Sequence, residues 1–175
     1  MFYPERTRGN PIPIKLVVGV VILAAIQVGG QSQSKATPIS SQTSLSPNAL
    51  YDLPGPFTPI ATISELPQPV KAALAMAFRQ NTLQIADPGK PFNATDVVDE
   101  RLPMRRLIFA GQAGERFVVH YERGGRGHSY YALVFDVKDH NSAALIGAAS
   151  YRQAARNIAK LKSLRHNDIS NSRSF

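Results

Sequence analysis

The middle of the chain brings together the three side-chain types that a small hydrolase combines: a base, an orienting carboxylate and a nucleophilic hydroxyl. They are His120, Glu122 and Ser129. Two runs rich in β-branched and aromatic residues carry them, 116–123 and 129–136, and such runs are typical of β-strands. Alternation along a strand can place side chains from two such strands on one face.

The expected hairpin register decides whether the three side chains meet. We predict the pairs Arg123 with His128, Glu122 with Ser129, and His120 with Tyr131. Two features count against catalysis: the hydroxyl lies within a strand, and no glycine-flanked nucleophile motif surrounds it. A slip of one residue would also scatter the group. We therefore assign no catalytic residue, and we interpret the patch as a half-solvated face with a Glu122–Ser129 hydrogen bond.

The same region offers nitrogen and oxygen ligands for a metal ion. No two of the histidines have the i, i+4 spacing of a helical zinc site, and the expected register points His120 and His128 to opposite faces. We predict neither a metal nor a cofactor. The candidate ligands are His120, Glu122, His128, Asp136 and His140.

The segment Gly124-Gly-Arg-Gly127 resembles a phosphate-binding loop only in composition. Such loops aim backbone amides and a helix N-terminus at the anion, whereas here a strand follows. We predict a hairpin turn with Arg126 at its tip, facing solvent and free to touch an acidic partner.

Aromatic residues are frequent in these strands, and one helix cannot cover both faces of the sheet that they form. An exposed aromatic patch is then the natural surface for a protein partner. The predicted binding residues are Tyr130, Tyr131, Arg126 and His120.

Helical periodicity flanks the strands. Residues 66–80 repeat apolar side chains at i, i+3 and i+4, with prolines only in the first turn. A strand at 105–111 precedes the hairpin, and a fourth is expected at 143–149. Residues 151–165 predict a second helix that begins at the N-cap Ser150. Its polar side is basic, which suits solvent, an anionic membrane surface or an acidic partner.

These elements predict an α+β fold: an N-terminal amphipathic helix packed on a three- to four-stranded antiparallel meander, followed by a basic C-terminal helix. The expected domain is 64–165, with a disordered tail at 166–175. The net charge is +8, and no cysteine is present, so neither disulfides nor cysteine-bound zinc arise.

The first 30 residues have the pattern of an export signal. Basic residues precede the uncharged run Leu16–Ile26, and small residues follow it. An uncleaved membrane anchor explains the pattern equally well. Residues 31–63 are rich in Pro, Ser and Gln and predict a disordered linker, within which Leu50–Phe57 could instead dock on the domain.

We conclude from the sequence that the chain is an exported or membrane-anchored small binding module facing the periplasm or exterior. Its partner would be a protein of the cell envelope, and export excludes nucleic acid. The alternatives are an accessory structural subunit of a membrane complex and, less favoured, a small hydrolase or metal-binding domain.

Overall fold

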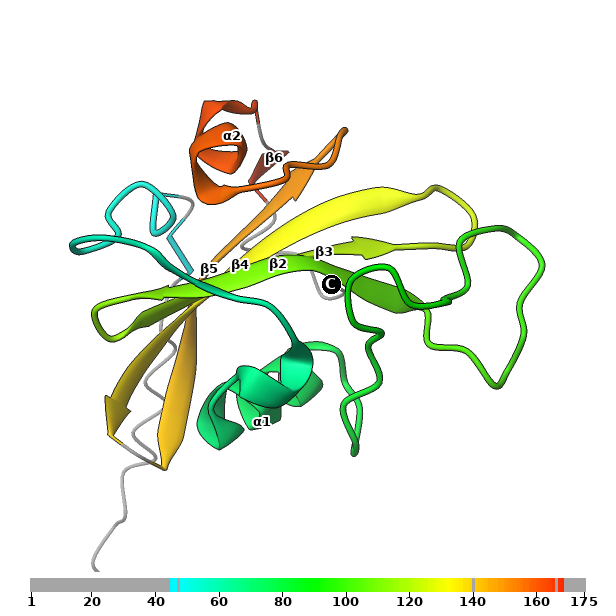
Figure 1. The fold of residues 1–175 in the computed structure, drawn as a ribbon, viewed down its shortest axis with the longest axis horizontal. Helices are drawn as coiled ribbons and strands as arrows, with labels where there is room; N and C mark the ends of the chain where they lie inside the picture. The colour runs from blue at the N-terminus through cyan, green and yellow to red at the C-terminus, as the bar shows by residue number, and fades with distance from the viewer. Residues whose placement is uncertain (1–44, 47, 140, 166, 169–175) are drawn as a thin grey trace, which may run out of the picture. The chain divides into compact units, whose positions relative to one another are not determined.

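An antiparallel sheet, with a helix on each of its two faces, makes up the part of the chain that the computed structural model describes (Figure 1). The described residues are 45–46, 48–139, 141–165 and 167–168. The sheet has six strands in chain order, β1-β2-β3-β4-β5-β6. The bounds are β1 Thr58–Ile60, β2 Arg105–Ala113, β3 Arg116–Arg123, β4 Ser129–Asp139, β5 Ser142–Tyr151, β6 Asn167–Asp168, a 3-10 turn Ile63–Glu65, α1 Gln68–Ala77 and α2 Ile158–Ser163. The expected mixed α+β class is confirmed.

Both faces of the sheet are apolar, because strand alternation sends successive buried side chains to opposite sides. One face packs under α1 and contributes Phe117, Val119, Tyr121, Leu133 and Phe135. The other face carries Val118, Ala132 and Val134, which pack with α2 and with the segment that precedes β1. The sheet is therefore the middle of three layers.

Helix α1 forms where the periodicity predicts it. Pro69 lies in its first turn, and Val70 and Leu74 are fully buried against the sheet. Phe78 closes the helix as its C-cap and lies edge-on to Tyr121, with ring centroids 5.0 Å apart. The apolar face of this helix therefore covers one side of the sheet, as expected.

The sheet is larger than expected, and the expected linker is too long. The described residues form six strands instead of three or four, because two short edge strands join the meander. Residues 58–60 form β1 on β2, and Ala49 and Leu50 are each only 4% exposed. The prolines led us to predict no strand in this segment, because proline argues against a central strand although an edge strand tolerates it. The prediction of a disordered linker is wrong for 48–63.

The C-terminal helix is also shorter than expected. Ser150 is not an N-cap. It belongs to β5, which ends at Tyr151, and it pairs with Tyr131 of β4. Helix α2 begins after Asn157, whose side chain accepts a hydrogen bond from the Lys160 amide at 2.8 Å. Over a few residues, a strand pattern and a helical pattern can place the same apolar side chains on one face. The sequence therefore did not locate the end of β5 and the start of α2.

A long connection, residues 87–104, is folded on itself by the Asn93 side chain, and its backbone lies against the β3–β4 hairpin at Gly124. Its side-chain nitrogen donates to the carbonyls of Asp99 and Leu102, and its oxygen accepts from the Asp99 amide at 2.7 Å. A Cβ on Gly124 would lie 1.7 Å from the Asn93 carbonyl oxygen. Glycine is therefore what permits this close approach.

Three predictions fall on residues outside the described ranges: the signal or anchor at 1–30, the linker at 31–44, and the tail beyond 168. Two tail residues, 167 and 168, are described and form β6 on β5. Within the described ranges, no helix has the length and apolar character needed to cross a membrane.

Candidate apolar binding groove

An apolar groove of about 520 Å³ opens at the outer edge of β2, beside the start of α2. Small-molecule sites usually occupy hundreds of cubic ångströms and are lined by apolar side chains with a few polar groups. Arg156 is the single charged residue among the described residues that line this groove. The full lining is Phe57, Pro59, Ile60, Ala61, Pro88, Ile108, Phe109, Ala110, Arg156, Asn157 and Ile158.

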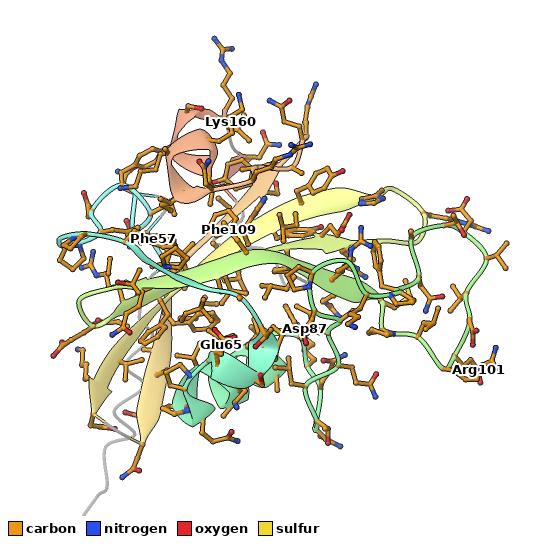
Figure 2. All side chains as sticks on the ribbon, viewed as in Figure 1. Phe57, Glu65, Asp87, Arg101, Phe109 and Lys160 are labelled. Atoms are coloured by element: carbon orange, nitrogen blue, oxygen red, sulfur yellow. The ribbon has the colours of Figure 1, made fainter. Side chains whose placement is uncertain are left out.

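Two phenylalanines form one wall of the groove. Figure 2 labels Phe57 and Phe109 next to each other, and their rings meet edge to face with centroids 6.1 Å apart. A Cβ on Gly111 would lie 2.2 Å from the Phe57 ring, so glycine at this position lets the ring lie against β2. Phe57, Phe109 and Ile158 also pack on the core beneath α2, which holds the wall in place.

The groove lies where the sheet edge has a gap. Strand β1 pairs with Ala110–Gln112, and further along Ala86 bridges to Arg106. Between these pairings a β-bulge interrupts the register of β2 with β3 at Leu107–Phe109. Among the described strands, none pairs with Ile108 or Phe109 on the outer side.

A second hollow of about 580 Å³ lies between the start of α1 and the β2–β3 turn, and its chemistry differs. Glu115, Lys138 and Asp139 all line it, together with Gln68 and Gln112. Charged side chains of both signs on its wall favour water over an apolar ligand. We therefore take the apolar groove as the better candidate.

His120 is wholly buried and is a structural residue. Its Nδ1 lies 2.8 Å from the Tyr131 carbonyl oxygen, and its Nε2 lies 3.1 Å from the Ala155 amide nitrogen. Because a carbonyl only accepts and an amide only donates, Nδ1 carries the proton and Nε2 is the acceptor. Burial lowers the pKa of His120 to about 4, against the smaller raising effects of the Tyr131 hydrogen bond and the Glu122 charge.

The structure separates the residues of the hydrolase alternative. The hairpin register is one residue away from the expected one, so Glu122 pairs with Tyr130, and Ser129 pairs with Arg123 on the other face. The hydroxyl of Ser129 donates to the Gly127 carbonyl. His120 uses both ring nitrogens on backbone groups. The predicted Glu122–Ser129 hydrogen bond is therefore wrong, and no nucleophile faces a base in this group.

Glu122 instead joins two basic side chains. Its carboxylate accepts from Arg106 Nε at 2.7 Å and from His128 Nε2 at 2.9 Å, with the Glu122 side chain only 10% exposed. The Arg106 guanidinium also lies over the Phe92 ring at 4.3 Å. These contacts tie the hairpin turn to the loop 87–104.

The five candidate metal ligands do not converge. Asp136 lies opposite Arg116, at the end of the hairpin away from the turn, and His140 lies outside the described residues. The described part of the chain contains no group of three or more potential ligands placed to hold a metal ion.

The structure places the two tyrosines of the predicted aromatic patch on opposite faces of the sheet, and both are partly exposed. Tyr131 stacks on buried Tyr121, with centroids 5.3 Å apart, on the face that α1 covers. Tyr130 lies on the opposite face, where it packs near His128. Arg126 alone among the predicted binding residues is exposed, at the tip of the hairpin between two glycines with positive φ, Gly125 and Gly127.

No protein-family model, no curated protein and no solved structure matches this chain. The candidate function therefore follows from the geometry and chemistry of the chain itself.

The residues of the groove were not predicted as a site. Phe57, Pro59 and Ile60 fell in the expected linker, and Arg156–Ile158 fell inside the expected helix. One clue was present: the segment Leu50–Phe57 is less polar than its surroundings, and its alternative interpretation as a docked segment agrees with the burial of Leu50.

Proposed function

We propose that the chain is an exported small binding module of the cell envelope, and that the apolar groove beside β2 is its binding site. The observation that carries the proposal is the groove itself: about 520 Å³ of space lined by phenylalanine, isoleucine, proline and alanine, with Arg156 as its one charged group among the described residues. When a ligand covers apolar surface left open in this way, that surface is removed from water, and this lowers the free energy and favours binding.

Export is part of the proposal and depends on residues 1–30. Their basic flank, apolar run and small residues favour delivery to or across a membrane. A cleaved signal gives a soluble module, and an uncleaved anchor gives a tethered one. The accessory-subunit alternative shares the anchor and differs in that its partner is a fixed membrane complex.

The test uses Nile red, an uncharged apolar dye whose fluorescence rises in apolar sites. Ala61 is exposed and lines the groove, so Ala61→Trp places an indole in the space. Ala72 is exposed on α1, which packs on the opposite face of the sheet, so Ala72→Trp is the matched control. We expect wild type and Ala72→Trp to bind the dye, and Ala61→Trp to bind it about tenfold more weakly.

Thermal unfolding of both variants checks that each remains folded. Equal dye binding by the two folded tryptophan variants would contradict the groove as the binding site.

A further inference from the structure

The edge position of the groove limits what can enter it. A peptide that extends a sheet needs a run of free edge positions, and natural strands average five or six residues. Here β1 occupies Ala110–Gln112, while Ala86 hydrogen-bonds to the Arg105 carbonyl and the Leu107 amide at 2.9 Å and 2.8 Å. The interval between them is too short for an added strand. A ligand must therefore insert a narrow apolar group into the groove instead of adding a strand to the sheet edge.

The charge around the groove favours an anionic head on that group. Arg156 lines the mouth, and the exposed side chains of Arg152 and Lys160 belong to the same basic segment. Two carboxylates lie beside the groove and are hydrogen-bonded to neighbouring groups: Glu65 accepts from the Ala61 amide and Thr62, and Asp87 accepts from the Ile63 amide. Neither of them lines the groove.

We propose that the groove binds the hydrocarbon chain of an anionic amphiphile, with the head group held at Arg156. This inference rests on the proposed function and adds the class of ligand. The apolar walls select the chain, and each methylene removed from water strengthens binding by about fourfold while the chain still fits. The guanidinium selects the sign of the head group, because it donates hydrogen bonds to carboxylate or phosphate oxygens.

Titration calorimetry with dodecanoate tests the proposal, each ligand being kept below its micelle concentration. Dodecyltrimethylammonium has the same chain and the opposite charge. We expect wild type to bind one dodecanoate and to bind the cation about threefold to fivefold more weakly, the effect of one exposed charge pair. We expect Arg156→Glu to reverse this order.

Arg126→Glu makes the same change of net charge at the hairpin tip, away from the groove, and should leave both affinities as in wild type. Equal binding of anion and cation by wild type would overturn the proposal. An equal loss of dodecanoate binding in the Arg126 and Arg156 variants would also overturn it, because general attraction to a basic protein would then explain the binding.

The outcomes separate this inference from the function on which it rests. If Ala61→Trp weakens Nile red binding and wild type binds no dodecanoate, the anionic amphiphile is ruled out and the groove remains a binding site. Failure of both ligands in wild type removes both proposals.

Discussion

The imidazole of His120 lies between two backbone groups, the carbonyl of Tyr131 and the amide of Ala155, and it has no access to solvent. The second of these contacts joins β3 to the segment before α2. Protonation of Nε2 would break it and would leave a charge in the apolar layer. A residue that the sequence offers as a binding or catalytic histidine thus holds two parts of the core together.

Stability should therefore depend on pH through His120. Its pKa is about 4 in the folded protein and 6.5 unfolded, so between these values the unfolded chain binds more protons. Stability contributed by the neutral ring is complete above about pH 6.5 and is lost as the pH falls towards 4, by up to about 3 kcal/mol. Urea unfolding at pH 7, 5.5 and 4.5 measures this loss.

His120→Phe provides the control. It should be destabilised at pH 7 by about 1–3 kcal/mol, because it leaves the Ala155 amide and the Tyr131 carbonyl unpaired, and its pH dependence should be weaker. His128→Gln removes a histidine that lies outside the core. The idea fails if His120→Phe retains the full pH dependence of wild type.

Tyr131 gives a second prediction at the residue scale. Its ring stacks on buried Tyr121 with an angle of 19° between the planes, so Tyr131→Ala opens space above the core. We expect the variant to lose about 2 kcal/mol of stability, and Tyr131→Phe to lose much less because it keeps the ring. Denaturant unfolding measures both. An alanine variant as stable as wild type would mean that the stack contributes nothing to the fold.

At the scale of elements, the loop 87–104 and the β3–β4 hairpin form one unit through Asn93 and Gly124. The pattern Asn93-Ala-Thr95 matches a glycosylation acceptor, but the Asn93 side chain is buried and hydrogen-bonded to Asp99 and Leu102. The folded protein therefore does not present it for modification.

Two glycine substitutions in the hairpin test this docking. Gly124→Ala must push the loop away, since its Cβ would overlap the Asn93 carbonyl, and we expect a loss of about 2 kcal/mol or more. Gly127→Ala meets nothing within 4 Å and has only the strain of a positive φ, about 1 kcal/mol. Unfolding midpoints rank the two variants, and the reverse order would contradict the docking.

The sequence predicted those elements whose own pattern is strong. Helix α1 and the β3–β4 hairpin have clear periodicity and a glycine turn, and the structure contains both. The hairpin register was wrong by one residue, because the five-residue loop 124–128 allows either pairing. Because of this shift of one residue, Glu122 and Ser129 no longer face each other, and the hydrolase hypothesis, which needs them together, fails.

The groove could not be predicted, because tertiary contacts create it. Phe57 gains its place only where Gly111 leaves room on β2, and Arg156 reaches the groove only because β5 ends at Tyr151 and α2 begins late. Each residue is ordinary in its local sequence. Their proximity depends on strand pairing over long separations, which periodicity does not encode.

At the scale of the whole molecule, the sequence combines an N-terminal segment typical of export with an α+β unit that carries an apolar groove beside β2. We predict that expressed full-length protein leaves the cytosol. Fractionation with carbonate extraction, followed by N-terminal sequencing, separates an anchored chain from a shortened soluble one. An unprocessed chain that stays soluble in the cytosol would contradict export without affecting the groove.

Isoleucine methyl NMR tests the central claim most directly, with 1-octanol as an uncharged apolar ligand. Three isoleucines line the groove, Ile60, Ile108 and Ile158, whereas Ile85 and Ile146 do not. If the groove is the binding site, the first three methyl signals shift together and saturably while the other two stay in place. Shifts confined to Ile85 or Ile146, or spread evenly over these five named residues, would contradict the account.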